Sequence, residues 1–246
     1  MVKVEFIESG LQHLTPGTRS RIEMGEMNGQ AAIRKTFLIP ESVESDELAR
    51  AIALYRKSLI NARLNIPKNY YVQTTASRME IVDQFIAGTN VNKMIQDNHP
   101  NTAPVWEKMI HQLCGANAGD HSLALIDVKP DNFLIDEEGV LYYVDLIPPM
   151  IFDSEGLISP WMPTIYKYDR QTATFLFGDT GGQVTRLLSL CELSYSQAVY
   201  DRLKEQALAI VVAGNLPPAI IEYIITQILD GFPDLYKIYG ATRKSK

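Results

Sequence analysis

The order of strand-like and helix-like segments most restricts the fold of this 246-residue chain. Up to about Gly88, apolar and polar residues tend to alternate as they do in strands, and the turn dipeptide Asn28-Gly29 separates two such segments. We predict strands at residues 2–7, 22–27, 31–38, 70–74 and 79–85. One helix, beginning near Ser45 with apolar residues at helical spacing, is predicted between the third and fourth strands.

After Gly88 the predicted elements are mainly helices. They cover residues 105–113, 171–177, 184–191, 196–212 and 217–229. No Gly/Ser-rich or Pro-rich linker marks the change, so the two halves should pack against each other. We therefore expect an α+β fold with two lobes. Residues 1–87 would form a small five-stranded antiparallel N-lobe with one helix, and residues 88–246 a mainly helical C-lobe.

Composition excludes several classes of protein. With 46% hydrophobic and 21% charged residues, the chain resembles an ordinary globular protein. No apolar run approaches the ~20 residues that span a bilayer, so no membrane partner is expected. The net charge of −6 argues against nucleic acid as a partner. Cys114 and Cys191 are far apart, without paired spacing, which predicts reduced thiols and a cytoplasmic location.

A short polar loop carries the strongest chemical signal. Asp127, Lys129 and Asn132 stand at offsets of zero, two and five, and Asp145 follows thirteen residues after Asn132, beyond a predicted hairpin. This set suits phosphoryl transfer from a magnesium nucleotide to a hydroxyl. One carboxylate receives the hydroxyl proton, a cation neutralises phosphoryl oxygens, and an amide oxygen and a second carboxylate hold the metal. A simple polar turn is the alternative, but Asp136-Glu137-Glu138-Gly139 already supplies the turn.

The segment Asp127-Val128-Lys129-Pro130-Asp131-Asn132 resembles the catalytic loop of the protein-kinase-like superfamily, and Asp145 resembles its metal-binding aspartate. The resemblance implies a two-lobed protein-kinase-like fold that uses ATP and Mg²⁺. It implies that Asp127 is the base and that Lys129 contacts the transferring phosphate. Asn132 and Asp145 would be the magnesium ligands.

The resemblance extends to the third predicted strand. Ala31-Ala32-Ile33-Arg34-Lys35 is similar to the kinase strand whose cation reaches the nucleotide phosphates. Neighbouring side chains point to opposite faces of a strand, so only one of Arg34 and Lys35 can point into the cleft. Alignment on Ala32 favours Arg34, and a shift of one residue makes the cation Lys35.

Two further groups are implied around the phosphates. Glu47, with Glu44 as the second choice, would be the helix acid that pairs with this cation. The loop Leu14–Ser20 replaces the glycine-rich phosphate loop of protein kinases, and its backbone N–H groups with the Thr18 and Ser20 hydroxyls would cradle phosphates.

The last strand of the N-lobe would lead into the segment that binds adenine. Glu80–Gly88 is similar to the corresponding kinase segment, and backbone groups of Gln84 and Ile86 would face the base. Asp83 stands where an apolar residue usually lies behind the adenine, which is a departure from the pattern.

The acceptor is suggested by two other departures. Leu125-Ile126 precedes Asp127 where regulated protein kinases carry His-Arg, and Leu146-Ile147-Pro148-Pro149 follows Asp145 with no later Ala-Pro-Glu segment. These features favour a phosphotransferase similar to aminoglycoside phosphotransferases and choline kinases, acting on a small-molecule hydroxyl. A Ser/Thr protein kinase and a nucleotide-binding pseudokinase scaffold stay open as alternatives, and no oligomeric state is predicted.

Overall fold

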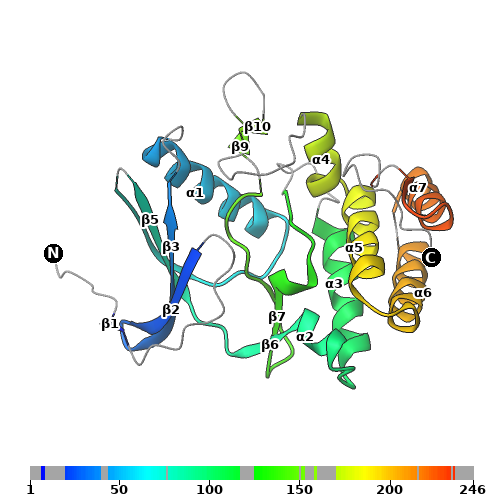
Figure 1. Cartoon of the computed structure of the whole chain (residues 1–246), viewed down its shortest axis with the longest axis horizontal. Helices are drawn as coiled ribbons and strands as arrows, with labels where there is room; N and C mark the ends of the chain where they lie inside the picture. Colours follow the sequence, from blue (N-terminus) through cyan, green and yellow to red (C-terminus); the bar gives the residue numbers. More distant parts are fainter. Residues whose placement is uncertain are drawn as a thin grey trace.

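The computed structural model describes residues 7–8, 20–39, 44–75, 77–116, 125–149, 151–152, 158–159, 170–214, 216–233 and 235. Figure 1 shows an antiparallel sheet with one helix beside a part built mainly of helices. The α+β prediction is therefore confirmed. Most of the strand predicted at residues 2–7 and most of the predicted phosphate loop lie outside the described residues.

The small sheet has the strand order β1-β2-β3-β5-β4, with all pairs antiparallel. Its strands are β1 (Ile7–Glu8), β2 (Ser20–Met27), β3 (Gln30–Leu38), β4 (Asn69–Thr74) and β5 (Arg78–Gln84). Asn28 and Gly29 join β2 to β3 with φ angles of 55° and 73°. A two-residue hairpin turn of this kind needs positive φ, which is why Asn-Gly predicted it.

The two faces of the small sheet have different neighbours. Helix α1 (Ser45–Asn61) packs on one face, which we call the inner face. Its apolar contacts are made by Phe37, Ile39, Leu48, Ile52, Met79 and Ile81. The opposite, outer face holds a small cluster of Met27, Ala32 and Val82, with Tyr70 and Tyr71 packed against it. Side chains alternate along β3, so Ala32 and Arg34 lie on the outer face, and Lys35 and Phe37 on the inner face.

The second part begins with a three-stranded sheet and continues as helices. The sheet is formed by β6 (Gly88–Asn90), β7 (Phe133–Asp136) and β8 (Leu141–Tyr143), and a ribbon pairs β9 (Ile151–Phe152) with β10 (Ile158–Ser159). The helices are α2 (Val91–Gln96), α3 (Thr102–Ala116), the 3₁₀ turn η1 (Pro130–Asn132), α4 (Arg170–Gly178), α5 (Thr180–Ser194), α6 (Gln197–Ala213) and α7 (Pro218–Leu229). All five helices predicted here are present. The six residues of α2 were not predicted, because they are too few to show a helical period.

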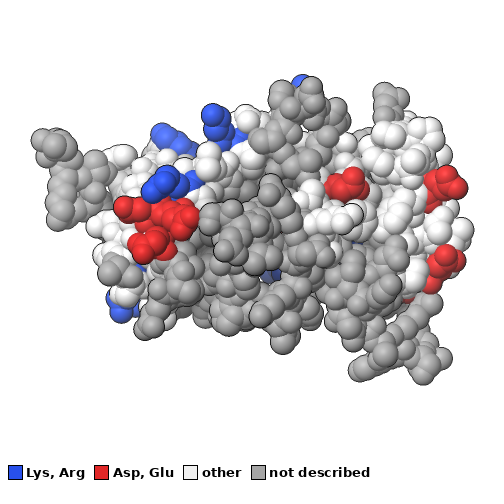
Figure 2. All heavy atoms as spheres, turned by 90° about the horizontal axis from the view of Figure 1, so that it is seen from above, with Lys and Arg blue, Asp and Glu red and all other residues white. Residues whose placement is uncertain are grey.

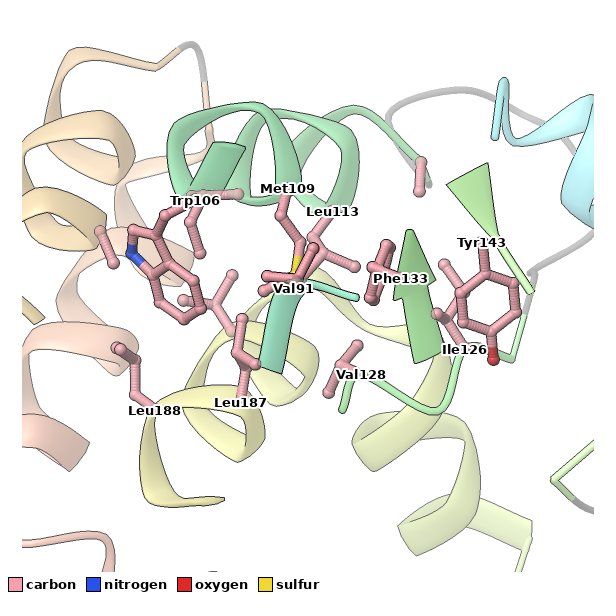
Figure 3. Close-up of a cluster of buried hydrophobic side chains, with 14 of the residues drawn as sticks. Val91, Trp106, Met109, Leu113, Ile126, Val128, Phe133, Tyr143, Leu187 and Leu188 are labelled. Atoms are coloured by element: carbon pink, nitrogen blue, oxygen red, sulfur yellow. The ribbon is translucent and has the colours of Figure 1, made fainter. Parts of the chain in front are cut away.

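The main core lies where α3, α5 and the loop hairpin meet (Figure 3). Trp106 of α3, Leu187 of α5 and Phe133 of β7 are fully buried there. The indole Nε1 of Trp106 donates a hydrogen bond to the carbonyl of Leu203 at 2.9 Å, so its burial leaves no unpaired N–H group. The polar loop is thus held on a packed helical base.

Cys114 and Cys191 are both free cysteines, and Cys191 is buried. Within the described part of the chain, none of the helices combines the length and the apolar character needed to cross a bilayer.

Candidate active site

The loop from Ile126 to Asn132 points alternate side chains in opposite directions. Ile126 and Val128 are fully buried in the main core, so Asp127 between them faces away from it. The η1 turn then reverses the chain, and the backbone N–H of Asn132 donates to the carbonyl of Lys129 at 2.9 Å. Asn132 Nδ2 closes the loop by donating to the backbone carbonyl of Asp127 at 2.8 Å. Local chain geometry therefore brings the first and last polar residues of the loop together.

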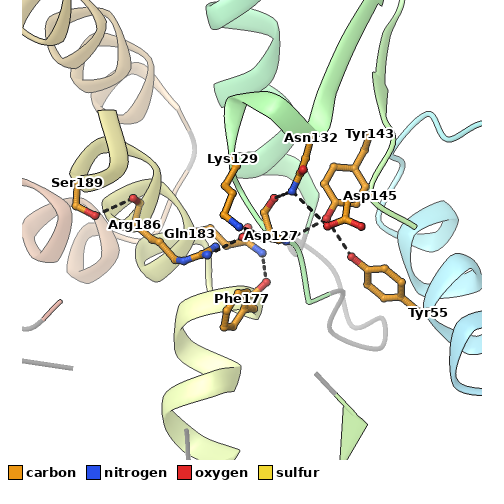
Figure 4. A network of polar contacts seen from close by, with 10 residues as sticks. All are labelled: Tyr55, Asp127, Lys129, Asn132, Tyr143, Asp145, Phe177, Gln183, Arg186 and Ser189. Carbon is orange, nitrogen blue, oxygen red and sulfur yellow. Dashed lines mark hydrogen bonds and ion pairs between the residues drawn. The ribbon is translucent and has the colours of Figure 1, made fainter. Parts of the chain in front are cut away.

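The hairpin β7-β8 brings Asp145 to the same place (Figure 4). The backbone N–H of Val144 donates to the carbonyl of Asn132 at 2.9 Å, and Asn132 Nδ2 lies 3.4 Å from Asp145 Oδ2. Neither bond made by the Asn132 side chain uses its Oδ1, the atom that a magnesium ligand would need. Asp127, Asn132 and Asp145 are therefore gathered in one site, as their spacing predicted.

The charge balance around Asp145 favours a cation. Burial, followed by the nearby charge of Asp127, raises the pKa of Asp145 from 3.8 to about 6. Lys35, Lys129 and the backbone N–H of Ile147 act in the opposite direction but do not cancel these effects. Burial and the nearby negative charge both disfavour the ionised carboxylate, and a bound divalent cation would favour it.

The two predicted magnesium ligands are an amide and a carboxylate, Asn132 and Asp145. Among the described residues, no three His, Cys, Asp or Glu side chains form a cluster that could hold a metal. The predicted pair differs from such a cluster because Asn132 supplies an amide oxygen beside the Asp145 carboxylate. Oxygen ligands of this kind suit Mg²⁺, which usually binds one or two carboxylates plus substrate phosphates and water.

Asp127 has a cation on each carboxylate oxygen. Arg186 Nη2 lies 2.6 Å from Oδ1, and Lys129 Nζ lies 2.8 Å from Oδ2. Burial by itself would raise the pKa of Asp127, but Arg186 and Lys129 together hold it below its usual value. Arg186 comes from α5, 59 residues further along the chain. Sequence reasoning missed it, because a single arginine within a helical segment carries no local signal.

Two buried tyrosines connect α1 to the loop. The backbone N–H of Asp127 donates to the Tyr143 hydroxyl at 3.1 Å, and the hydroxyls of Tyr143 and Tyr55 are 3.2 Å apart. Burial is the main reason that the pKa of each phenol is raised, and the charge of Asp145 adds to it. Both hydroxyls therefore stay neutral and can act as hydrogen-bond partners. Neither was predicted as a site residue, since Tyr55 belongs to the apolar stripe of a helix and Tyr143 to a hairpin strand.

The structure brings Lys35, rather than the favoured Arg34, to the loop. Lys35 Nζ donates to the carbonyl of Val144 at 2.9 Å, and its charge lowers the pKa of the adjacent Asp145. Arg34 lies on the outer face, where Nη2 is 2.8 Å from Glu23 and Nε is 3.8 Å from Glu80. Alignment on Ala32 favoured Arg34, but of these two cations it is Lys35, from the opposite face of the strand, whose side chain reaches the loop.

Other predicted phosphate-binding residues are not gathered with Lys35. Glu47 is exposed in the first turn of α1, and among the described residues no ion pair joins it to Lys35. Figure 2 shows acidic side chains grouped beside basic ones at the end of the molecule that holds the small sheet and α1. Ser20 is the first residue of β2. Thr18 lies outside the described residues.

Contacts with α1 and β4 explain why Asp83 of β5 is not apolar. Asp83 is buried on the inner face and forms an ion pair of 3.0 Å with Arg56 of α1. Asn69 Nδ2 donates to the same carboxylate oxygen at 2.9 Å. The backbone N–H of Gln84, one of the two residues predicted to face adenine, donates to the carbonyl of Lys68 at 2.8 Å. Ile86 follows as a buried residue.

No protein-family model matches the chain, and no curated protein matches it. Among solved structures, the crystal structure of Rad53 1–466 in complex with AMP-PNP overlaps with 58% of this chain, at 18% sequence identity and a TM-score of 0.42. The overlap covers 38% of the Rad53 chain, well under two thirds of its length. The functional proposal rests on the geometry of the site instead of on this partial likeness.

Proposed function

We propose that this chain is an ATP-dependent phosphotransferase with a two-lobed protein-kinase-like fold, residues 1–87 being the N-lobe and 88–246 the C-lobe. One observation carries the proposal: Lys35 of the small sheet meets the Asp127, Asn132 and Asp145 set at the loop carbonyl of Val144. A cation from one lobe and two carboxylates with an amide from the other are the groups that phosphoryl transfer requires.

Each residue has a defined task in this reaction. Asp127 orients the acceptor hydroxyl and takes its proton as the oxygen attacks phosphorus. Lys35 and Lys129 neutralise phosphoryl oxygens, and Lys129 can turn toward them because its side chain is 48% exposed. Asn132 and Asp145 would hold Mg²⁺, which when bound supplies electrostatic stabilisation of the charge on the phosphates.

The remaining contacts of the nucleotide are proposed by position. The carbonyl of Gln84 and the backbone of Ile86 would bind the adenine edge, and Thr18 and Ser20 would contact phosphates. Glu47 has no place in this assignment, because the Lys35 ammonium is held by a backbone carbonyl of the loop. Among the described residues, Tyr55 of α1 and Tyr143 link the helix to the site by their hydrogen bond, and no ion pair of Glu47 with Lys35 does so.

The proposed acceptor is a hydroxyl of a small molecule. Asp127 is not preceded by a His-Arg pair, Asp145 is not followed by a Phe-Gly pair, and no Ala-Pro-Glu segment comes later in the sequence, although all three are associated with switched protein kinases. Release of ADP in the presence of amino alcohols, sugars or aminoglycosides, compared with transfer of label from ATP to generic proteins, separates the two acceptor classes.

The proposal is tested by ADP release and by thermal denaturation with ATP, with and without Mg²⁺. We expect magnesium-dependent ADP release that falls roughly 10²- to 10⁴-fold in Asp127→Asn, a variant of nearly the same shape. We also expect Mg·ATP to raise the melting temperature of the wild type but not that of Asp145→Asn. Binding without turnover in any acceptor screen would make the chain a nucleotide-binding scaffold. No thermal shift with any nucleotide would refute both functions.

A further inference from the structure

The carboxylate of Asp127 is held by two cations that differ in how firmly they are placed. The Arg186 side chain is 7% exposed and that of Lys129 is 48% exposed. Figure 4 shows the two cations approaching Asp127 from different elements, Arg186 from α5 and Lys129 from the loop itself. If the buried guanidinium of Arg186 moved away from Asp127, its charge would be left without a partner and without water. The exposed Lys129 can exchange Asp127 for water or for a phosphate at little cost.

The Arg186 guanidinium lies against the ring of Phe177, a residue that is itself held in place by hydrogen bonds. The Cζ atom of Arg186 lies 4.4 Å from the centre of the Phe177 ring. The carbonyl of Phe177 accepts hydrogen bonds from the backbone N–H of Ile126, at 2.6 Å, and from the Gln183 side chain. The end of α4, the start of α5 and the residue before Asp127 are therefore tied at one carbonyl group.

The junction of α4 and α5 also permits little movement. A Cβ atom placed at Gly182 would lie 2.0 Å from the carbonyl oxygen of Phe175, so only glycine allows this approach of the helices. Arg186 follows four residues later on the same buried helix, between Thr185 and Leu187, which are both fully buried. Its position relative to Asp127 is set by the core and not by side-chain rotation at a surface.

We propose that Arg186 is a positioning residue that holds Asp127 Oδ1 and leaves Oδ2 as the atom that accepts the hydroxyl proton. The inference rests on the proposed phosphotransferase function. Lys129 leaves Oδ2 for the phosphoryl oxygens when ATP binds, and the acceptor hydroxyl takes its place. The acceptor O–H proton moves to Oδ2 while its oxygen bonds to the γ-phosphorus. The bond from that phosphorus to the β–γ bridging oxygen breaks, and ADP leaves with the electron pair.

A counterion that only stabilises the fold would behave differently in kinetics. A positioning residue acts through Asp127, so its removal should lower kcat without weakening nucleotide binding. Its effect should also vanish when Asp127 can no longer act as a base, since the two side chains work as one unit. A structural counterion would have an effect that is independent of the chemistry of Asp127.

The experiment uses the full chain, with Mg·ATP as substrate and water as the acceptor. The variants are Arg186→Met, Arg186→Lys, Asp127→Asn and the double variant Arg186→Met/Asp127→Asn. Arg202→Met is the control, because Arg202 is an exposed helical arginine bonded to Asn98 at 2.9 Å. The quantities are kcat and KM for ATP in ADP release, and the thermal shift produced by Mg·ATP.

We expect Arg186→Met to lower kcat by about 10²-fold, the size of loss that misplacement of a reacting group by about 1 Å produces. KM for ATP and the Mg·ATP thermal shift should match the wild type, Arg186→Lys should recover part of kcat, and Arg202→Met should change nothing. In the Asp127→Asn background, Arg186→Met should cause no further loss.

Three results would overturn the positioning role: a kcat for Arg186→Met close to the wild-type value, an equal loss in the Asp127→Asn background, or loss of the nucleotide shift. If Arg186→Met does not fold, Arg186→Lys takes its place, and its loss of kcat is compared in the wild-type and Asp127→Asn backgrounds. A wild type without ADP release or thermal shift rejects the proposed function itself, whereas an active wild type with an equally active Arg186→Met rejects only this inference.

Discussion

The inner and outer faces of the small sheet both carry charged residues, but they use them differently. On the outer face, Arg34 forms ion pairs with Glu23 and Glu80, and Glu23 also pairs with Arg21 at 2.7 Å. On the inner face, Asp83 is neutralised by Arg56. Lys35, on that same face, makes no ion pair with any described residue and donates to a carbonyl beside Asp145.

This difference shows how adjacent cations on one strand can have unrelated roles. The outer charges neutralise one another and hold strands β2, β3 and β5 together. The inner lysine keeps its charge available to the site, because its neighbour is a peptide carbonyl and not a carboxylate. The amino acid type is similar at the two positions, and the face of the strand decides the role.

The proposed difference between the two faces is tested most directly by replacing Lys35 and Arg34 one at a time. Lys35→Met should lower kcat/KM for ADP release by roughly 10³- to 10⁵-fold, as loss of a cation from a transferring phosphoryl group does. Arg34→Met should keep kcat/KM near the wild-type value and lower the free energy of unfolding by about 1–3 kcal/mol, because Glu23 stays buried with fewer partners.

Steady-state ADP release and urea denaturation of the two variants give the comparison. The reverse pattern, with activity lost in Arg34→Met and kept in Lys35→Met, would show that the outer face holds the nucleotide.

The second prediction concerns the buried ion pair on each face. Arg56→Met should lower the free energy of unfolding by about 3–5 kcal/mol, because it leaves Asp83 buried without its cation. Glu23→Gln on the outer face should cost less, about 1–2 kcal/mol, since Arg34 keeps Glu80 at 3.8 Å. Chemical denaturation measures both values.

The double variant Arg56→Met/Asp83→Leu is the control for the stability loss predicted in Arg56→Met. It should recover most of the lost stability, because replacing both partners removes the unpaired charge. A double variant as unstable as Arg56→Met would mean that the loss comes from packing and from the Arg56 bond to the carbonyl of Pro67.

The smallest predicted effect is a pH-dependent change in stability caused by Asp145, the carboxylate near Lys35. Its pKa in the folded protein, about 6, is above the ordinary value of 3.8. The folded state therefore binds this proton more tightly, and the associated stability is complete below the ordinary pKa and lost as pH rises through about 6. At pH 7 and without ligands, Asp145→Asn should be more stable than the wild type by roughly 1–3 kcal/mol.

Denaturation between about pH 4 and pH 8 tests this linkage, since the difference should shrink toward the acidic end. Saturating Mg·ATP should reverse the order at pH 7, because only the wild type keeps the carboxylate proposed to bind the metal. A stability difference that does not vary with pH would contradict the charge imbalance at Asp145.

Local patterns predicted most of the elements for identifiable reasons. Asn28-Gly29 has the positive φ angles that the β2-β3 hairpin needs, and the apolar residues of α1 and α3 recur at helical spacing along the buried sides of those helices. The pairing of β6 with β7 was not predicted, because Gly88–Asn90 is too short to show alternation. A Cβ at Gly88 would lie 2.5 Å from the carbonyl oxygen of Ile135, a close approach that becomes visible only once the strands are paired.

By itself, the sequence determined the association of Asp127, Asn132 and Asp145. A 3₁₀ turn and one hairpin connect these residues, so short-range chain geometry sets their separation. Only the tertiary structure decided that Lys35, and not Arg34, reaches the loop, and that Arg186 contacts the Asp127 carboxylate. Those contacts join residues 109 and 59 positions apart. They depend on which face of β3 meets the loop and which helix covers Asp127, and the packing of whole elements settles both.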